Sequence, residues 1–196
     1  MADFLSAPTL VKLVTASRTQ SLTGVGDFRP NLGEAWLVWG AQATSGGFSF
    51  TDGVNSINSS PDSGSATLIT NSTYIHHSGS GVAVISAGLI SEAQWIVSAL
   101  VNGGADFRPP LGEAWIVTAC NGGDFRLASA QGVAADSVPY RGLFNEKWDA
   151  PPNIPPSLDQ NAMWPGLLLT NAVYLRNAAA AGTYGFVSAY KIPTTV

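Results

Sequence analysis

The stretch GDFRPNLGEAWLV at residues 26–38 returns as ADFRPPLGEAWIV at residues 105–117. Two further pairs follow in the same order: LITNSTYIHH (68–77) matches LLTNAVYLRN (168–177), and SAGLI (86–90) matches SAYKI (188–192). Three matching blocks in one order indicate a single structural unit that is used twice. The sequence therefore predicts two tandem copies of one fold, produced by an internal duplication.

The composition favours short strands joined by turns. Charged residues make up 11% of the 196 residues and hydrophobic residues 45%, with 21 Gly and 12 Pro. A disordered chain is more charged and less apolar than this, and long helices need Glu, Lys, Arg and Leu, which are scarce here. Abundant Gly, Ser, Thr, Asn and Val favour strands and turns, so we expect an all-β protein.

Charge and cysteine content argue against several classes of protein. The net charge is -4 and the few Lys and Arg do not cluster, so we expect no nucleic-acid partner. No apolar run approaches the roughly 20 residues of a membrane helix, and the N-terminus lacks the basic start of a secretory signal. Cys120 is the single cysteine, which excludes an intrachain disulfide and fits synthesis in a reducing cytoplasm.

The low charge also bears on how the surface is used. A free monomer usually carries about a quarter charged residues. A chain at 11% is therefore expected to place much of its surface against other protein. The alternative is a neutral monomer whose surface is covered by Ser, Thr and Asn.

Apolar patterns and turn signals predict about six strands per copy and no helix. The expected strands are residues 10–16, 34–39, 46–50, 68–77 and 82–90 in the first copy, and 90–100, 113–118, 122–126, 168–176 and 184–192 in the second. Regular short strands of this kind indicate a β-sandwich or barrel. The strand at 34–39 has apolar residues at both parities, so we expect it to be covered on both faces. Cys120 continues the equivalent strand, where a small buried residue is expected rather than a nucleophile.

The repeated turn carries an arginine and a glutamate in both copies. Residues 30–33 and 109–112 are turn-like, because Pro fixes φ and Gly tolerates positive φ. A hairpin at these turns places Arg29 opposite Glu34 and Arg108 opposite Glu113. Opposite charges across a strand pair contribute up to about 1 kcal/mol, so we interpret these residues as structural hairpin pairs rather than catalytic groups.

The second copy contains an insertion. Asn71 and Asn171 are 100 positions apart whereas Asp27 and Asp106 are 79 apart, so the second copy holds about 21 more residues, around 141–165. Five prolines and two tryptophans predict an extended loop, and such loops often carry binding. The alternative is that both tryptophans fold back on the sandwich. The candidate protein-contact residues are Phe4, Leu5, Trp148, Pro151, Pro152, Pro155, Pro156 and Trp164.

The expected organisation is therefore an N-terminal arm at residues 1–8, a first sandwich repeat at 9–88, and a second at 89–196 that includes the insertion. The arm either orders on a neighbouring molecule or plugs the base of the sandwich with Phe4 and Leu5.

Motifs for catalysis and cofactor binding are scarce. His76 and His77 are adjacent on an expected surface strand and point to opposite faces, so they are poorly placed to chelate one metal. The sequence contains no P-loop, no CxxC, no nucleophile elbow and no EF-hand spacing. We predict no catalytic residues, no metal and no cofactor. The enzymatic alternative is a pair of carboxylates brought together in a cleft.

RPNLGEAWLV and RPPLGEAWIV, each followed by an LITNSTYIHH- or LLTNAVYLRN-type strand and a Gly-rich turn into a last strand, resemble small β-sandwich proteins of tailed bacteriophages. These are similar to capsid decoration (cement) proteins with jelly-roll-like folds, and the resemblance covers most of the chain. It implies two tandem jelly-roll-like units and a non-enzymatic virion protein, made in the host cytoplasm. Such a protein binds the major capsid protein on the outer surface of the phage head and stabilises the shell.

The resemblance also implies a homo-oligomer, with a trimer as the first expectation and a dimer as the second. The alternative function is a tail-fibre or host-recognition module that binds glycans, in which Tyr140, Trp148 and Trp164 stack on sugars.

Overall fold

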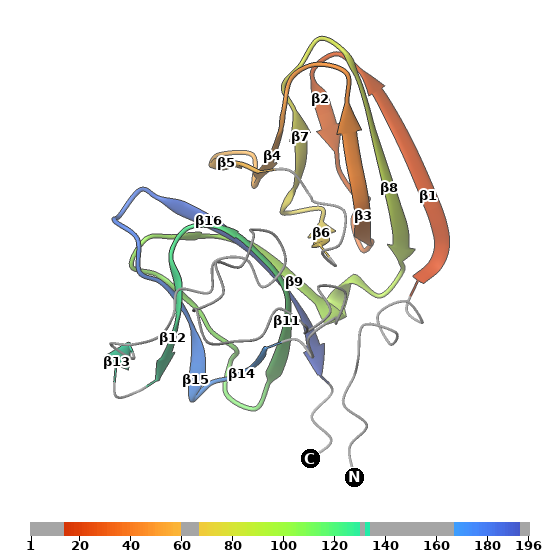
Figure 1. The fold of residues 1–196 in the computed structure, drawn as a ribbon. Coiled ribbons are helices and arrows are strands. Elements are labelled where there is room, and N and C mark those ends of the chain that lie inside the picture. Colours follow the sequence, from red (N-terminus) through yellow and green to blue (C-terminus); the bar gives the residue numbers. More distant parts are fainter. Residues whose placement is uncertain (1–13, 60–66, 130–131, 134–166, 193–196) are drawn as a thin grey trace, which may run out of the picture.

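The chain folds into short strands in four antiparallel sheets (Figure 1). The computed structural model describes residues 14–59, 67–129, 132–133 and 167–192. The first half contains β1 (Val14–Thr23), β2 (Gly26–Phe28), β3 (Ala35–Ala43), β4 (Phe48–Thr51), β5 (Ser56–Asn58), β6 (Thr67–Thr70), β7 (Tyr74–His77) and β8 (Val82–Ile90). The second half contains the 3-10 helix η1 (Ala93–Trp95), β9 (Ile96–Asn102), β10 (Asp106–Phe107), β11 (Ala114–Gly122), β12 (Phe125–Ser129), β13 (Gly132–Val133), β14 (Leu168–Thr170), β15 (Val173–Asn177) and β16 (Tyr184–Ile192).

The two halves have the same strand order. In the first half the sheets run β1-β8-β3-β6 and β2-β7-β4-β5, and in the second they run β9-β16-β11-β14 and β10-β15-β12-β13. Eight antiparallel strands in two sheets with this order form a jelly-roll sandwich. The all-β sandwich prediction is therefore confirmed, with eight strands in each half of the described chain rather than about six. The duplication that the repeated blocks predict stays a prediction.

Alternation along the central strands builds the sandwich core. In β8, Ala83, Ile85 and Ala87 are buried in the first core, whereas Ser86 between them is exposed. The core is apolar because every second residue of a strand points to the same face of the sheet. The predicted bounds of this last strand, and of β16 in the second half, match the structure. The first predicted strand differs, because β1 extends to Thr23.

The alternating block at residues 68–77 is two strands rather than one. β6 ends at Thr70 and β7 begins at Tyr74, and the two strands belong to different sheets. The Thr70 N–H donates to the Thr73 carbonyl at 2.9 Å and closes the turn between them. The same break separates β14 from β15. Alternation alone could not locate this break, because residues on both sides of the turn are apolar and buried alike.

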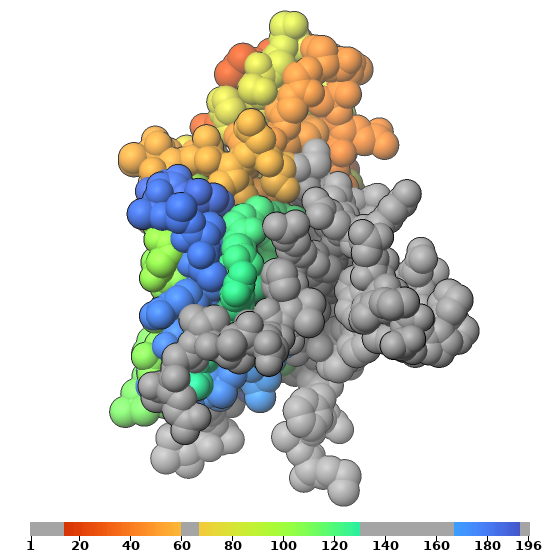
Figure 2. All heavy atoms as spheres, turned by 60° about the vertical axis from the view of Figure 1, so that its left-hand side comes forward, coloured from red at the N-terminus to blue at the C-terminus, as the bar shows by residue number. Residues whose placement is uncertain are grey.

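The two halves share one buried core. Phe186 of β16 belongs to the same buried cluster as Phe28, Trp36 and Phe50 of the first half. The rings of Phe186 and Phe50 stack with centroids 4.0 Å apart and an interplanar angle of 12°. In Figure 2 the orange and yellow atoms of the first half lie directly on the blue and green atoms of the second. The outer face of one sheet of the second half therefore closes one end of the first sandwich.

A second buried cluster extends this junction. Ala35, Leu37 and Leu68 of the first half pack with Ile96 of the second. The Leu68 N–H donates to the Ser188 Oγ at 3.2 Å across the junction. Residues 35–38 of β3 are all buried, so the prediction of a strand covered on both faces is confirmed over that span. The second half supplies the outer cover.

Candidate interaction surface

A clamp around the repeated arginine fixes the turn of the first half. The Arg29 Nε donates to the Asn71 carbonyl at 2.7 Å, and its guanidinium lies 4.4 Å from the centroid of the Tyr74 ring. The Asn71 Nδ2 donates to the Pro30 carbonyl at 2.8 Å. These contacts tie the segment after β2 to the turn between β6 and β7.

The second half contains the same clamp. The Arg108 Nε donates to the Asn171 carbonyl at 2.8 Å, and its guanidinium lies 4.5 Å from the centroid of the Tyr174 ring. The Asn171 Nδ2 donates to the Pro109 carbonyl at 3.0 Å. Cation–π stacking and side-chain hydrogen bonds thus give the same Arg, Pro, Asn and Tyr the same structural role in both halves.

The hairpin pair predicted in the first half is wrong. β2 and β3 lie in different sheets, so Arg29 and Glu34 do not face each other across a strand pair. Glu34 instead accepts from the Asn31 Nδ2 at 3.0 Å and lies 4.0 Å from the Arg18 guanidinium.

The pair predicted in the second half, Arg108 with Glu113, is wrong for the same reason. β10 and β11 lie in different sheets. Glu113 accepts from the Trp115 Nε1 at 2.8 Å and lies 3.8 Å from the Lys191 Nζ.

Each clamped turn holds a leucine in solvent. The Glu34 N–H donates to the Asn31 carbonyl at 3.0 Å, and Gly33 has a φ of 85° that favours glycine. Leu32 at the tip of this turn is 90% exposed. In the second half Gly112 has a φ of 88°, and Leu111 before it is 89% exposed. Two matched turns therefore present the same apolar side chain.

Both turns border one cleft between the halves. The cleft has a volume of about 490 Å³. Its apolar lining includes Leu32 and Pro110 from the turns, together with Ala93, Ile96 and Trp115. Polar lining residues are Glu34, Thr70, Asn71, Ser72, Ser98, Glu113 and Lys191.

The polar side chains of the cleft already have partners within the protein. The Thr70 Oγ1 lies 3.0 Å from the Ser72 Oγ and 3.0 Å from the Ser98 Oγ. Asn71 and the two glutamates are held by the contacts described above. A polar ligand would compete with these hydrogen bonds.

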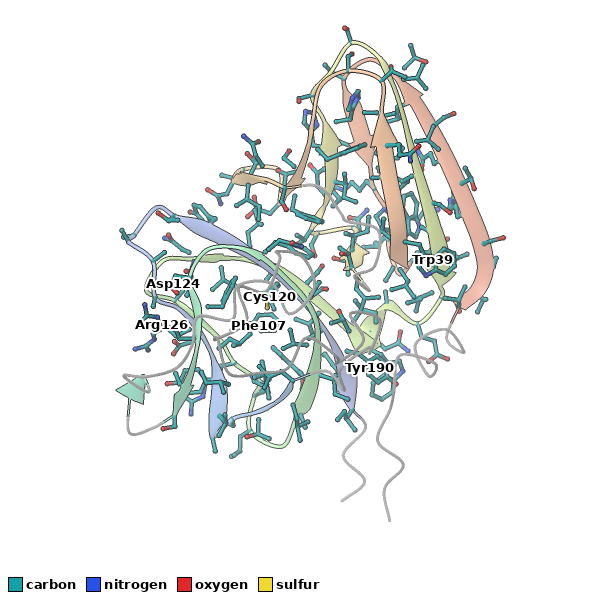
Figure 3. The ribbon with its side chains drawn as sticks, viewed as in Figure 1. Trp39, Phe107, Cys120, Asp124, Arg126 and Tyr190 are labelled. Carbon is teal, nitrogen blue, oxygen red and sulfur yellow. The ribbon has the colours of Figure 1, made fainter. Side chains whose placement is uncertain are left out.

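Every lysine and arginine in the described ranges is also engaged. Arg29 and Arg108 lie over tyrosine rings, and the other four form ion pairs: Arg18 with Glu34, Arg126 with Asp124, Arg176 with Asp106, and Lys191 with Glu113. Asp124 and Arg126 lie together at the outer edge of the second sandwich (Figure 3). The hydrogen bond to Asp124 raises the pKa of Arg126. The surface formed by these residues carries locally balanced charge.

The two histidines have different environments. The His76 Nδ1 lies 2.7 Å from the Asp27 Oδ1 at the surface. His77 is fully buried, and its two ring nitrogens each lie 2.9 Å from a backbone carbonyl oxygen, one of Gly24 and one of Ser45. The prediction of a surface position is therefore wrong for His77, because strand β7 turns this residue into the sandwich.

The second half fills the same two positions with other side chains. Arg176 replaces His76 and pairs with Asp106 at 2.6 Å. Asn177 replaces His77, is fully buried, and donates from Nδ2 to the carbonyls of Val101 at 2.8 Å and Thr183 at 3.0 Å. In both halves, these two positions make contacts within their own sandwich.

Cys120 points into the second sandwich beside Phe107 (Figure 3). Burial raises the pKa of its thiol to about 12. The prediction of a small buried residue is confirmed. Across the described ranges, no group of three or more His, Cys, Asp or Glu side chains is placed to hold a metal ion. No helix in the same ranges is long and apolar enough to cross a membrane.

The predicted contact residues lie outside the described residues. These are Phe4 and Leu5 of the arm and Trp148, Pro151, Pro152, Pro155, Pro156 and Trp164 of the insertion. Sequence reasoning missed Leu32 and Leu111, although a signal was available: an apolar residue occupies the same position of a Pro- and Gly-containing turn in both copies.

Comparison of the chain with protein-family models and with curated proteins found no match.

Proposed function

We propose that this chain is a structural protein of a bacteriophage virion that decorates the outer surface of the head and stabilises the shell. The observation that carries the proposal is the joining of two jelly-roll sandwiches into one body through a shared buried core, centred on the stack of Phe50 and Phe186. A protein that braces a shell must transmit load between its contact points without yielding. Close-packed cores have low compressibility and suit that task.

The charge distribution supports a protein partner. Charged residues are depleted in the cores of protein interfaces, and the chain carries only 11% of them. The described cations are paired within the protein, so the surface suits a neutral protein partner such as the major capsid protein. Weak contacts made by many copies add through avidity on a symmetric shell.

The sequence resemblance points in the same direction. The RPNLGEAWLV and RPPLGEAWIV blocks resemble those of phage decoration proteins, and they form the clamped turns described above. In this proposal Phe4, Leu5 and the aromatic and proline residues of the insertion contact the shell. The protein acts as a homo-oligomer, with a trimer as the first expectation and a dimer as the second.

The proposal is tested with virions grown from a phage genome that carries the gene and from the same genome with the gene deleted. Release of DNA on heating is followed with a fluorescent dye. We expect the deleted virions to release DNA at a lower temperature, and purified full-length protein added back to restore the original temperature. Equal release temperatures for the two kinds of virion would contradict the proposal.

Matched variants locate the contact. Trp148→Ala and Trp164→Ala are expected to weaken the rescue, whereas Val54→Ala, at an exposed position outside the proposed contact, is expected to rescue fully. If Trp148→Ala instead abolishes glycan binding by the purified protein while rescue is unaffected, the host-recognition function is favoured.

A further inference from the structure

We infer that Glu34, which lines the cleft between the halves, is a side-chain switch whose carboxylate exchanges between the Asn31 amide and the buried indole N–H of Trp36. Arg18 holds the carboxylate on the Asn31 side, which is the position in this structure. The inference concerns a conformational change within the first half. It goes beyond the proposed function and does not depend on it.

Trp36 carries a hydrogen-bond donor that is not used. Its side chain is 1% exposed, and within the described ranges its Nε1 is the one buried side-chain nitrogen or oxygen atom without a hydrogen-bond partner. A buried N–H without a partner has lost its bond to water and gained none in return. An acceptor that can reach this N–H by a side-chain rotation is therefore favoured.

The second half shows which residue can supply the acceptor. Trp115 occupies the position of Trp36 and donates from Nε1 to the Glu113 Oε2 at 2.8 Å. In both halves the glutamate comes two residues before the tryptophan and directly before the strand. The glutamate N–H also donates to the carbonyl three residues earlier in both halves, at 3.0 Å in the first and 3.1 Å in the second. Glu34 thus lies on the same backbone conformation as Glu113.

Two residues that are particular to the first half hold Glu34 in another position. The Asn31 Nδ2 donates to the Glu34 Oε2 at 3.0 Å, whereas the second half has Pro110 at this place, which offers no amide. The Arg18 Nη1 lies 4.0 Å from the same oxygen, and the guanidinium lies 5.1 Å from the centroid of the Trp36 ring. The side chains that select between the two positions therefore lie next to both partners.

Arg18 determines which partner Glu34 keeps. The equivalent residue of the second half is Val97, because each lies opposite the alanine of the matching SAGLI and SAYKI blocks. In the described ranges, Arg18 is the only cation paired with Glu34. When an acidic group of another molecule pairs with Arg18, Glu34 loses this partner and its bond to Trp36 is favoured. The coupling is reciprocal, so the bond to Trp36 also frees Arg18 for that group.

The switch is tested by NMR of the full chain with isotope-labelled tryptophan, in which each indole N–H gives a signal of its own. Trp36→Phe and Trp115→Phe assign the two signals, and Trp115 is the internal standard for an indole bonded to a carboxylate. Asn31→Pro, which introduces the residue of the second half, and Arg18→Val are each expected to move the Trp36 proton signal downfield, toward that of Trp115. The double variant is expected to move it further.

Asn31→Ala removes the amide without constraining the backbone and is expected to shift the signal in the same direction. Leu32→Ala is the matched control, because it changes an exposed side chain of the same turn and no contact of Glu34, and it is expected to leave the signal in place. Thermal unfolding checks that each variant retains the fold.

Addition of Glu34→Ala to the double variant identifies the acceptor. We expect it to return the Trp36 signal to its wild-type position. A signal that stays in place in Arg18→Val or in both Asn31 variants, or a shift that persists without Glu34, would overturn the inference.

Discussion

The outer face of the central strand is open in one half and buried in the other. Ser86 of β8 is exposed to solvent, and its neighbour Val84 is half-buried. The equivalent residues of β16, Ser188 and Phe186, are fully buried against the first half. One sandwich scaffold thus serves two purposes. The inward side chains and clamps maintain the fold in both halves, whereas the outward side chains of the second half decide how the halves assemble.

The buried positions 77 and 177 show that different residues can also have the same role in the two halves. His77 and Asn177 differ chemically but occupy equivalent positions, and each bridges two backbone carbonyls inside its sandwich. Two different residues here make the same kind of contact with the backbone. On the outer faces, by contrast, equivalent positions are exposed in one half and buried in the other. Sequence difference between the copies is therefore a poor guide to function unless burial is known.

The largest expected effect is at the junction of the halves. Phe186→Ala removes a fully buried ring that stacks on Phe50, so we expect a loss of about 3–5 kcal/mol in the free energy of unfolding. Val84→Ala, the equivalent change in the first half, is expected to lose about 1 kcal/mol or less because Val84 is only half-buried. Denaturant unfolding measures both, and calorimetry of Phe186→Ala is expected to resolve two transitions. Equal losses would refute the asymmetry of the outer faces.

The buried bridging positions come next. His77→Ala leaves the carbonyls of Gly24 and Ser45 without this partner, and Asn177→Ala does the same to those of Val101 and Thr183. We expect each to lower the free energy of unfolding by about 2–4 kcal/mol, since an unpaired buried polar group costs about 1–3 kcal/mol.

His77→Asn, which introduces the residue of the second half, is the control. It is expected to lose less than His77→Ala in the same denaturant titration. A loss as large as that of alanine would contradict the shared role of His77 and Asn177.

Equivalent substitutions in the two arginine clamps are expected to lower the free energy of unfolding by the same amount. Arg29→Lys and Arg108→Lys each keep the charge but lose the planar group that lies over the tyrosine ring and bonds the asparagine. We expect a loss of about 1 kcal/mol in each case, measured by denaturant unfolding. If the two losses differ by more than about 1 kcal/mol, the two clamps contribute unequally to the free energy of unfolding.

The smallest expected effect is at Cys120. Ala41 occupies the equivalent position of the first half, so Cys120→Ala places the first-half residue in the second core and is expected to change stability by less than about 0.8 kcal/mol.

The Cys120 thiol itself is expected to be unreactive toward a disulfide reagent at pH 8 in the folded protein, because burial raises its pKa to about 12. The same thiol in denaturant is the control and should react fully. Rapid reaction of the folded protein would show that the second core opens.

Much of the fold could be predicted from local pattern. The glycine-marked turns and the alternation along β8 and β16 depend on neighbouring residues, and these predictions agree with the structure. The partner of Arg29 could not be predicted in this way, because Asn71 lies 42 residues away in another block. The burial of Phe186 likewise depends on how the two sandwiches dock. The exposure of Leu32 and Leu111 likewise depends on clamps that join residues far apart in the sequence.

The most direct test of the proposed function is electron cryo-microscopy of virions from a genome that carries the gene, compared with virions in which the gene is deleted. We predict that only the first kind shows density on the outer surface of the head into which the two joined sandwiches fit. Density for this chain on the tail, or its absence from the virion, would contradict the account.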